Sequence, residues 1–117
     1  MEAHSHVYPM PSPELSGKRQ ELAPGIGSAF RDFSRQVFAA GALDAKTKQL
    51  IALAVAHVTQ CPYCIRSHTK GALREGAEEN EMMEAIWVAA EMRAGGAVAH
   101  SVIALATMEA AASVQPS

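Results

Sequence analysis

Two stretches of the chain are apolar on every face of a helix, and they limit what the chain can fold into. Residues 50–58 carry a single polar side chain, His57, and residues 97–112 are nearly as apolar. Helices of this kind are buried on all sides, yet a chain of 117 residues has little material of its own to cover two of them. We therefore expect a homo-oligomer in which other subunits cover these helices.

The remaining apolar residues also follow helical spacing. Steps of four, three and four separate Ile26, Phe30, Phe33 and Val37. This stripe predicts a helix that begins at Pro24, packs on a core with one face, and stops near Gly41. No segment shows sustained alternation of apolar and polar residues, so we predict an all-α fold of about five to six helices.

Helix-terminal signals set the other boundaries. Asp44 is the expected N-cap of the helix that contains residues 50–58. Pro62 suits the first position of the next helix, and Gly76 suits its C-terminal cap.

The C-terminal third of the chain predicts two helices. Asn80 is a candidate N-cap for a helix that runs to about Arg93. We expect Gly95 and Gly96 to break it and residues 97–112 to form the last helix.

The N-terminal residues 1–13 contain three prolines and no periodicity, which predicts a mobile arm before one domain over residues 14–117. His4 and His6 lie in this arm, and we assign them no role. The chain carries a net charge of −2 with scattered Lys and Arg, so we expect no nucleic-acid partner. Because no apolar run approaches about 18 residues and the start lacks a secretory pattern, we expect a cytoplasmic protein with no membrane partner.

The segment CPYCIRSH, residues 61–68, is the strongest chemical signal. It holds both cysteines of the chain. On a helix that begins here, Cys61, Cys64 and His68 share one face. A pair with this spacing in a reducing compartment is typical of a catalytic or metal-binding site.

The two thiols are expected to differ in reactivity. The N–H groups of a helix start stabilise a thiolate at Cys61, whereas His68 can take the proton of Cys64 one turn earlier. One sulfur can then attack an oxidant while the other closes an intramolecular disulfide.

Two other interpretations use the same residues. In the first, zinc binds Cys61, Cys64 and His68, with His57 or His100 as a fourth ligand. In the second, both cysteines are buried small hydrophobic residues and His68 is an exposed helix residue.

The chain resembles the carboxymuconolactone decarboxylase superfamily, in particular its AhpD-like alkylhydroperoxidase branch. The resemblance covers about residues 24–112 and is strongest in GALDAKTKQLIALAVAHVTQCPYCIRSHTKGALREGA and EAIWVAAEMRAGGAVAH. It implies an all-helical fold in trimers or hexamers, with the cysteine helix near a subunit interface. It also implies no metal or bound organic cofactor.

The resemblance further implies a thiol-dependent hydroperoxidase or disulfide reductase in which Cys64 attacks a hydroperoxide and Cys61 resolves the product. His68 then belongs to a proton relay, and a lipoyl or thioredoxin-like dithiol supplies electrons. The family's relay glutamate stands where this chain has Gln49, and some members have histidine where it has Tyr63.

His57 and His100 each lie in an apolar helix, where we expect a buried, hydrogen-bonded histidine with, at most, a secondary role in the site. Two other functions remain open. One is the lactone-acid decarboxylation that names the superfamily, and the other is a non-enzymatic, redox-sensing oligomeric module.

Overall fold

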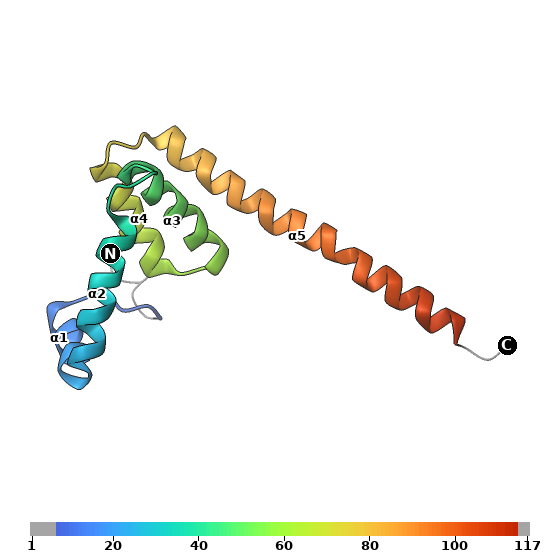
Figure 1. The fold of residues 1–117 in the computed structure, drawn as a ribbon, viewed down its shortest axis with the longest axis horizontal. Coiled ribbons are helices and arrows are strands. Elements are labelled where there is room, and N and C mark those ends of the chain that lie inside the picture. Colours follow the sequence, from blue (N-terminus) through green and yellow to red (C-terminus); the bar gives the residue numbers. More distant parts are fainter. Residues whose placement is uncertain (1–6, 115–117) are drawn as a thin grey trace. The chain divides into compact units, whose positions relative to one another are not determined.

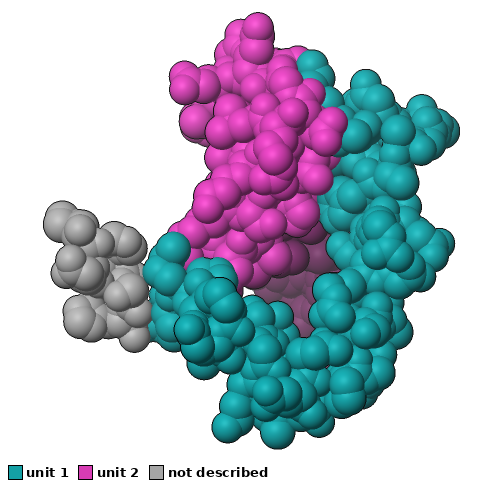
Figure 2. Space-filling model, turned by 90° about the vertical axis from the view of Figure 1, so that its left-hand side faces the viewer, with its two compact units in different colours: residues 1–48 teal, residues 49–117 magenta. Residues whose placement is uncertain are grey.

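The computed structural model describes residues 7–114, and these form five α-helices and no strand. The helices follow one another along the chain as α1 to α5 (Figure 1). The predicted all-α fold class is confirmed. Residues 1–48 and 49–117 make two compact units (Figure 2). His4, His6 and the first part of the predicted arm lie outside the described residues.

The first unit contains α1 (Pro13–Leu22) and α2 (Pro24–Phe38). No periodicity predicted α1, whose sequence has no apolar stripe, and it begins inside the predicted arm. Its start is stabilised locally, because the Ser12 hydroxyl accepts a hydrogen bond from Leu15 N at 3.1 Å and Pro13 stands at the first position. Capping, and not burial, therefore determines where α1 begins.

The second helix, α2, has the predicted stripe, but the stripe does not pack on a core. Ile26, Phe30, Phe33 and Val37 are all exposed. A lysine side chain binds the C-terminal end of α2. Lys48 Nζ donates to the carbonyl oxygens of Val37 at 2.8 Å and of Ala39 at 2.6 Å. The prediction of a helix was correct, and the prediction that its apolar face is covered was wrong within this chain.

Two predicted caps position α3 (Ala45–Thr59) and α4 (Pro62–Arg74). The Asp44 carboxylate accepts from Thr47 N at 2.8 Å, as expected of an N-cap. Hydrogen bonds from the side chain and then the backbone of Thr47 lower the pKa of Asp44. Pro62 is the first residue of α4, and Gly76 follows its end with φ of 88°. That conformation favours glycine, so the predicted stop at Gly76 is confirmed.

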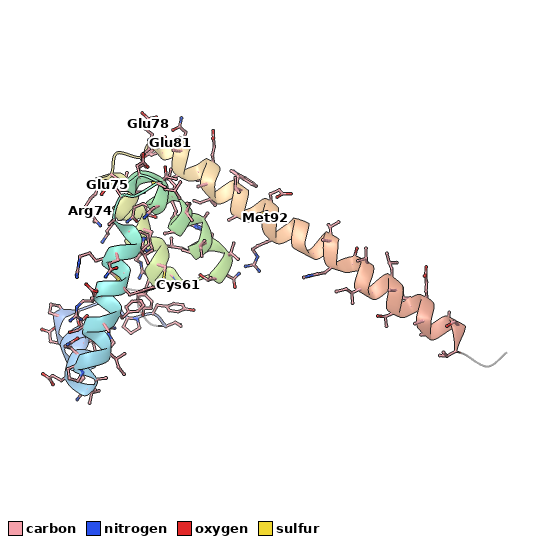
Figure 3. All side chains as sticks on the ribbon, in the orientation of Figure 1. Cys61, Arg74, Glu75, Glu78, Glu81 and Met92 are labelled. Carbon is pink, nitrogen blue, oxygen red and sulfur yellow. The ribbon has the colours of Figure 1, made fainter. Side chains whose placement is uncertain are left out.

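The fifth helix, α5 (Glu79–Ser113), is continuous over 35 residues. The predicted break at Gly95 and Gly96 was wrong, because neither glycine has a positive φ and the flanking residues are strong helix formers. The predicted cap at Asn80 was also wrong. Glu78 caps the helix instead, and its N–H donates to Glu81 Oε1 at 2.8 Å in a capping box (Figure 3).

The core of the second unit is made mostly of small side chains. Its buried members are Leu53, Ala72, Ala77 and Met82, against which Leu50 and Ile86 pack. Leu53, on α3, is 1 % exposed. This core joins the end of α4 to α3 and to the first turns of α5.

The outer part of α5 extends away from α3 and α4 (Figure 1). Every described residue from 97 to 114 is exposed. Val98, for example, is 72 % exposed and Leu105 is 55 % exposed. By length and mean hydropathy alone, α5 meets the criterion for a helix that can cross a membrane. The expectation that residues 97–112 are buried on all sides is therefore not met within one chain.

Candidate functional site

The turn between α3 and α4 brings the first cysteine to a helix start. Gln60 has φ of 60°, the left-handed conformation that ends a helix, and Cys61 N donates to Ala56 O at 3.2 Å across the turn. Arg93 of α5 donates to Val58 O at 2.9 Å and satisfies another carbonyl at the end of α3. These two hydrogen bonds fix the backbone on the N-terminal side of Cys61.

Cys61 is the N-cap of α4 (Figure 3). Its sulfur accepts a hydrogen bond from Cys64 N at 3.2 Å, as a serine hydroxyl does at most helix starts. The two thiols also form a hydrogen bond with each other, with their sulfur atoms 2.7 Å apart. Both cysteines are free thiols and half-buried. The predicted pair is therefore together at the predicted helix start.

The two cysteines have opposite pKa shifts. The pKa of Cys61 is lowered because the Cys64 thiol donates to its sulfur, with further help from the backbone N–H groups of Cys64 and Tyr63. The pKa of Cys64 is raised because its proton is engaged in that same hydrogen bond and because the thiol is partly buried. Of the two sulfurs, Cys61 is therefore the one that loses its proton more readily.

His68 lies one turn beyond Cys64 on α4, and it contacts Gln49 of α3. The distance from His68 Nδ1 to Gln49 Oε1 is 2.8 Å. Because an amide oxygen only accepts hydrogen bonds, Nδ1 carries the proton and Nε2 of the neutral ring is the basic nitrogen. Burial lowers the pKa of His68, so the ring is neutral at pH 7. A neutral imidazole with a defined tautomer can act as a proton acceptor.

The other predicted positions are more peripheral. Tyr63 is exposed, and its backbone N–H contributes to the low pKa of Cys61. His57 is half-buried, and its Nδ1 donates to Leu53 O at 2.8 Å within α3, as expected of a histidine in an apolar helix. His100 is exposed on α5, so the expectation that it is buried was wrong for this chain.

Within residues 7–114, no three His, Cys, Asp or Glu residues are grouped to hold a metal ion.

Sequence reasoning did not single out Gly71, which is buried beside Gln49. The available signal was its place inside α4, where glycine is a poor helix former. Gly71 shares a helix face with Cys64 and His68, at steps of four and three residues.

Comparison with known proteins adds the family. The family model described as carboxymuconolactone decarboxylase family matches residues 24–107. The chain belongs to this family. A curated relative from Paracoccus denitrificans, an uncharacterized protein of the cox locus, is 60% identical over 93 residues, which are 80% of this chain and 84% of the relative. An uncharacterized protein from Cupriavidus necator is 32% identical over 94 residues, covering 80% and 83% of the two chains.

Solved structures of carboxymuconolactone decarboxylase family proteins have the same fold. One from Legionella pneumophila superposes with a TM-score of 0.64 at 33% identity, over 68% of this chain and 70% of that one. One from Thermotoga maritima, for which a part in the antioxidative response has been suggested, gives a TM-score of 0.55 at 30% identity, over 74% and 90%. These matches confirm the predicted superfamily and its all-helical fold.

Proposed function

We propose that the protein is a thiol-dependent peroxidase that reduces hydroperoxides through Cys64, Cys61 and His68. The observation that carries the proposal is the 2.7 Å separation of the two sulfur atoms at the start of α4. Two sulfur atoms this close need only a small movement to form a disulfide. The antioxidative role suggested for the Thermotoga maritima relative is consistent with such chemistry.

The first step uses His68 as the base. Its Nε2 accepts the Cys64 proton, and the Cys64 thiolate attacks the terminal oxygen of the hydroperoxide. The O–O bond breaks, and the leaving alkoxide takes the proton from His68 to become an alcohol. The sulfur is oxidised by two electrons to a sulfenic acid, and the peroxide is reduced by the same two electrons.

The second step uses Cys61, whose lowered pKa favours its thiolate form. Its sulfur attacks Cys64 Sγ, the S–OH bond breaks, and the departing hydroxide takes a proton from solvent to become water. An external dithiol, of lipoyl or thioredoxin type, then attacks Cys64 Sγ of the disulfide. Its second thiol releases Cys64 and closes the donor's own disulfide.

The pKa order supports this division of labour. A thiol with a low pKa is a weaker nucleophile but leaves a disulfide faster. The lowered pKa of Cys61 therefore suits a sulfur that resolves and then leaves, whereas the raised pKa of Cys64 suits a sulfur that attacks once His68 has removed its proton.

The test is the intact mass of the reduced protein before and after one equivalent of cumene hydroperoxide. We expect a loss of about 2 Da, from two hydrogens, that dithiothreitol reverses. Repeated turnover with dihydrolipoamide as the donor separates a peroxidase from a redox-sensing module, which reacts once. An unchanged mass would contradict the proposal and leave the family's decarboxylase activity, which needs neither cysteine, as the better explanation.

The exposed apolar residues support a second proposal, that the protein is a homo-oligomer, a trimer or a hexamer. Val102, Ile103 and Met108 lie on different sides of α5, and all three are exposed. One neighbouring helix covers only one side, so several copies are needed to cover α5. The small residues at 94–97 and 110–112 allow helices of other copies to approach closely.

A further inference from the structure

Gly71 occupies a position in α4 where a side chain would collide with Gln49. A Cβ atom built on Gly71 would lie 2.7 Å from Gln49 Cδ and 3.2 Å from Gln49 Nε2, with Oε1 closer than either. Real Cβ atoms do not approach other atoms so closely, so the amide of Gln49 would have to move. The amide of Gln49 therefore rests directly against the backbone of α4.

This close approach is what brings Gln49 to His68. The Gln49 oxygen that would meet the new Cβ is the same Oε1 that accepts from His68 Nδ1 at 2.8 Å. Gly71 is buried and lies three residues beyond His68, so the amide covers the backbone at one position and contacts the ring one turn earlier. Any displacement of the amide by a methyl group changes its contact with His68.

The helix itself does not need a glycine at this position. Gly71 is interior to α4 and has no positive φ, so alanine suits the backbone better. Gly17, inside α1, provides the contrast, because a Cβ there would meet nothing within 4 Å. The requirement at position 71 therefore comes from Gln49 and not from the helix.

We propose that Gly71 is a positioning residue. Because it has no side chain, the Gln49 amide can reach His68, and this contact fixes the Nδ1–H tautomer of the base. Its effect on turnover rests on the proposed peroxidase function, and its effect on the His68 tautomer does not. Gly71 touches no reacting atom. It acts by leaving space for the group that orients the imidazole.

The experiment is a double-mutant cycle between Gly71→Ala and Gln49→Ala, with two readouts. The first is the pair of ¹⁵N chemical shifts of the His68 ring in the reduced protein, which report the tautomer. The second is the rate of hydroperoxide consumption. We expect Gly71→Ala to lower the population of the Nδ1–H tautomer and to reduce the rate by about 10- to 100-fold.

In the Gln49→Ala background, Gly71→Ala should change neither readout further, because the colliding amide is gone. There it should raise the melting temperature by about 2–5 °C, the gain expected of alanine over glycine in a helix. This double variant keeps the test valid if Gly71→Ala alone folds poorly. Gly17→Ala is the matched control and should leave the rate and the His68 shifts unchanged.

The outcomes separate this inference from the proposed function. Equal effects of Gly71→Ala in both backgrounds, or His68 shifts that do not respond to it, would overturn the inference. If the wild-type protein consumes no hydroperoxide while the His68 shifts still respond through Gln49, the peroxidase proposal fails and the role of Gly71 stands.

Discussion

The start of α4 and the outer part of α5 differ in what one chain supplies to each. At the start of α4, backbone N–H groups, a neighbouring thiol and the Gln49 amide provide partners for the polar groups of the site. Along residues 97–114, the same chain leaves every residue exposed. The polar contacts of the cysteine site are therefore completed within one chain, whereas that chain leaves the apolar surface of the outer part of α5 uncovered.

Replacement of each cysteine tests the chemistry proposed for the start of α4. We expect Cys64→Ser to lower hydroperoxide consumption by on the order of 10⁴-fold or more, because it removes the attacking sulfur. Cys61→Ser should still complete one turnover and leave a sulfenic acid on Cys64. Peptide mass spectrometry after trapping with dimedone locates the adduct. An adduct on Cys61 in Cys64→Ser, formed at the wild-type rate, would reverse the assignment of the two roles.

A charge on the outer part of α5 tests the other side. Leu105→Glu should convert the proposed trimer or hexamer to a monomer of about 12.4 kDa, because an interface around this helix would have to bury an unpaired carboxylate. Light scattering at micromolar concentration measures the change. Ser16→Glu adds the same charge on α1 and should leave the assembly intact. A well-folded wild-type monomer would refute the assembly, and binding of that monomer to lipid vesicles would assign α5 to a membrane.

A carboxylate in place of Gln49 tests whether this position takes part in proton transfer. Gln49→Glu should raise the rate of peroxide reduction at neutral pH by up to about 100-fold, because a carboxylate can relay a proton that an amide cannot. It should also move the acidic limb of the rate to higher pH. Burial holds the pKa of His68 below its ordinary value in the wild type, and a carboxylate that accepts from Nδ1 raises it.

Stopped-flow measurements from about pH 5 to 9 check both effects. The wild-type rate should fall only on the acidic side of the ordinary histidine pKa, because burial lowers the pKa of His68. Gln49→Ala, which provides no carboxylate, is the control. A pH profile unaltered by Gln49→Glu would remove Gln49 from the relay.

Substitutions at two positions with positive φ, before and after α4, should change the stability of the protein by a small amount. Gln60→Gly should raise the free energy of unfolding by about 1 kcal/mol, because glycine adopts the left-handed conformation of this position without a Cβ penalty. Gly76→Ala, the opposite change at the end of α4, should lower it by a similar amount. Urea denaturation measures both. A loss of peroxidase activity in Gln60→Gly would show that this side chain takes part in the chemistry.

The parts of the fold that depend on local sequence could be predicted. Helix boundaries are set by the backbone and side-chain chemistry of single residues, such as Asp44, Pro62 and Gly76. Each of these boundaries could therefore be predicted from the sequence alone. The same holds for the cysteine pair at the helix start. The continuity of α5 was missed because two adjacent glycines weaken a helix without obliging it to end, and the surrounding residues decided the outcome.

The finer features of the site depend on contacts between helices, which spacing along one helix cannot give. The hydrogen bond from His68 to Gln49 joins residues 19 apart in sequence. Its importance was indicated by the family resemblance and not by spacing. The space that Gly71 leaves for an amide likewise follows from side-chain positions on two packed helices.

The use of a cysteine sulfur as the cap of α4 links the oxidation state to the order of the helix. Cys61 Sγ accepts the N–H of Cys64 most strongly as a thiolate, and a sulfur in a disulfide has lost that charge. In the proposed catalytic cycle, each oxidation should therefore weaken the first turn of the helix, and each reduction should restore it. Amide hydrogen exchange at Cys64 should therefore be faster after oxidation of the cysteine pair than in the reduced protein.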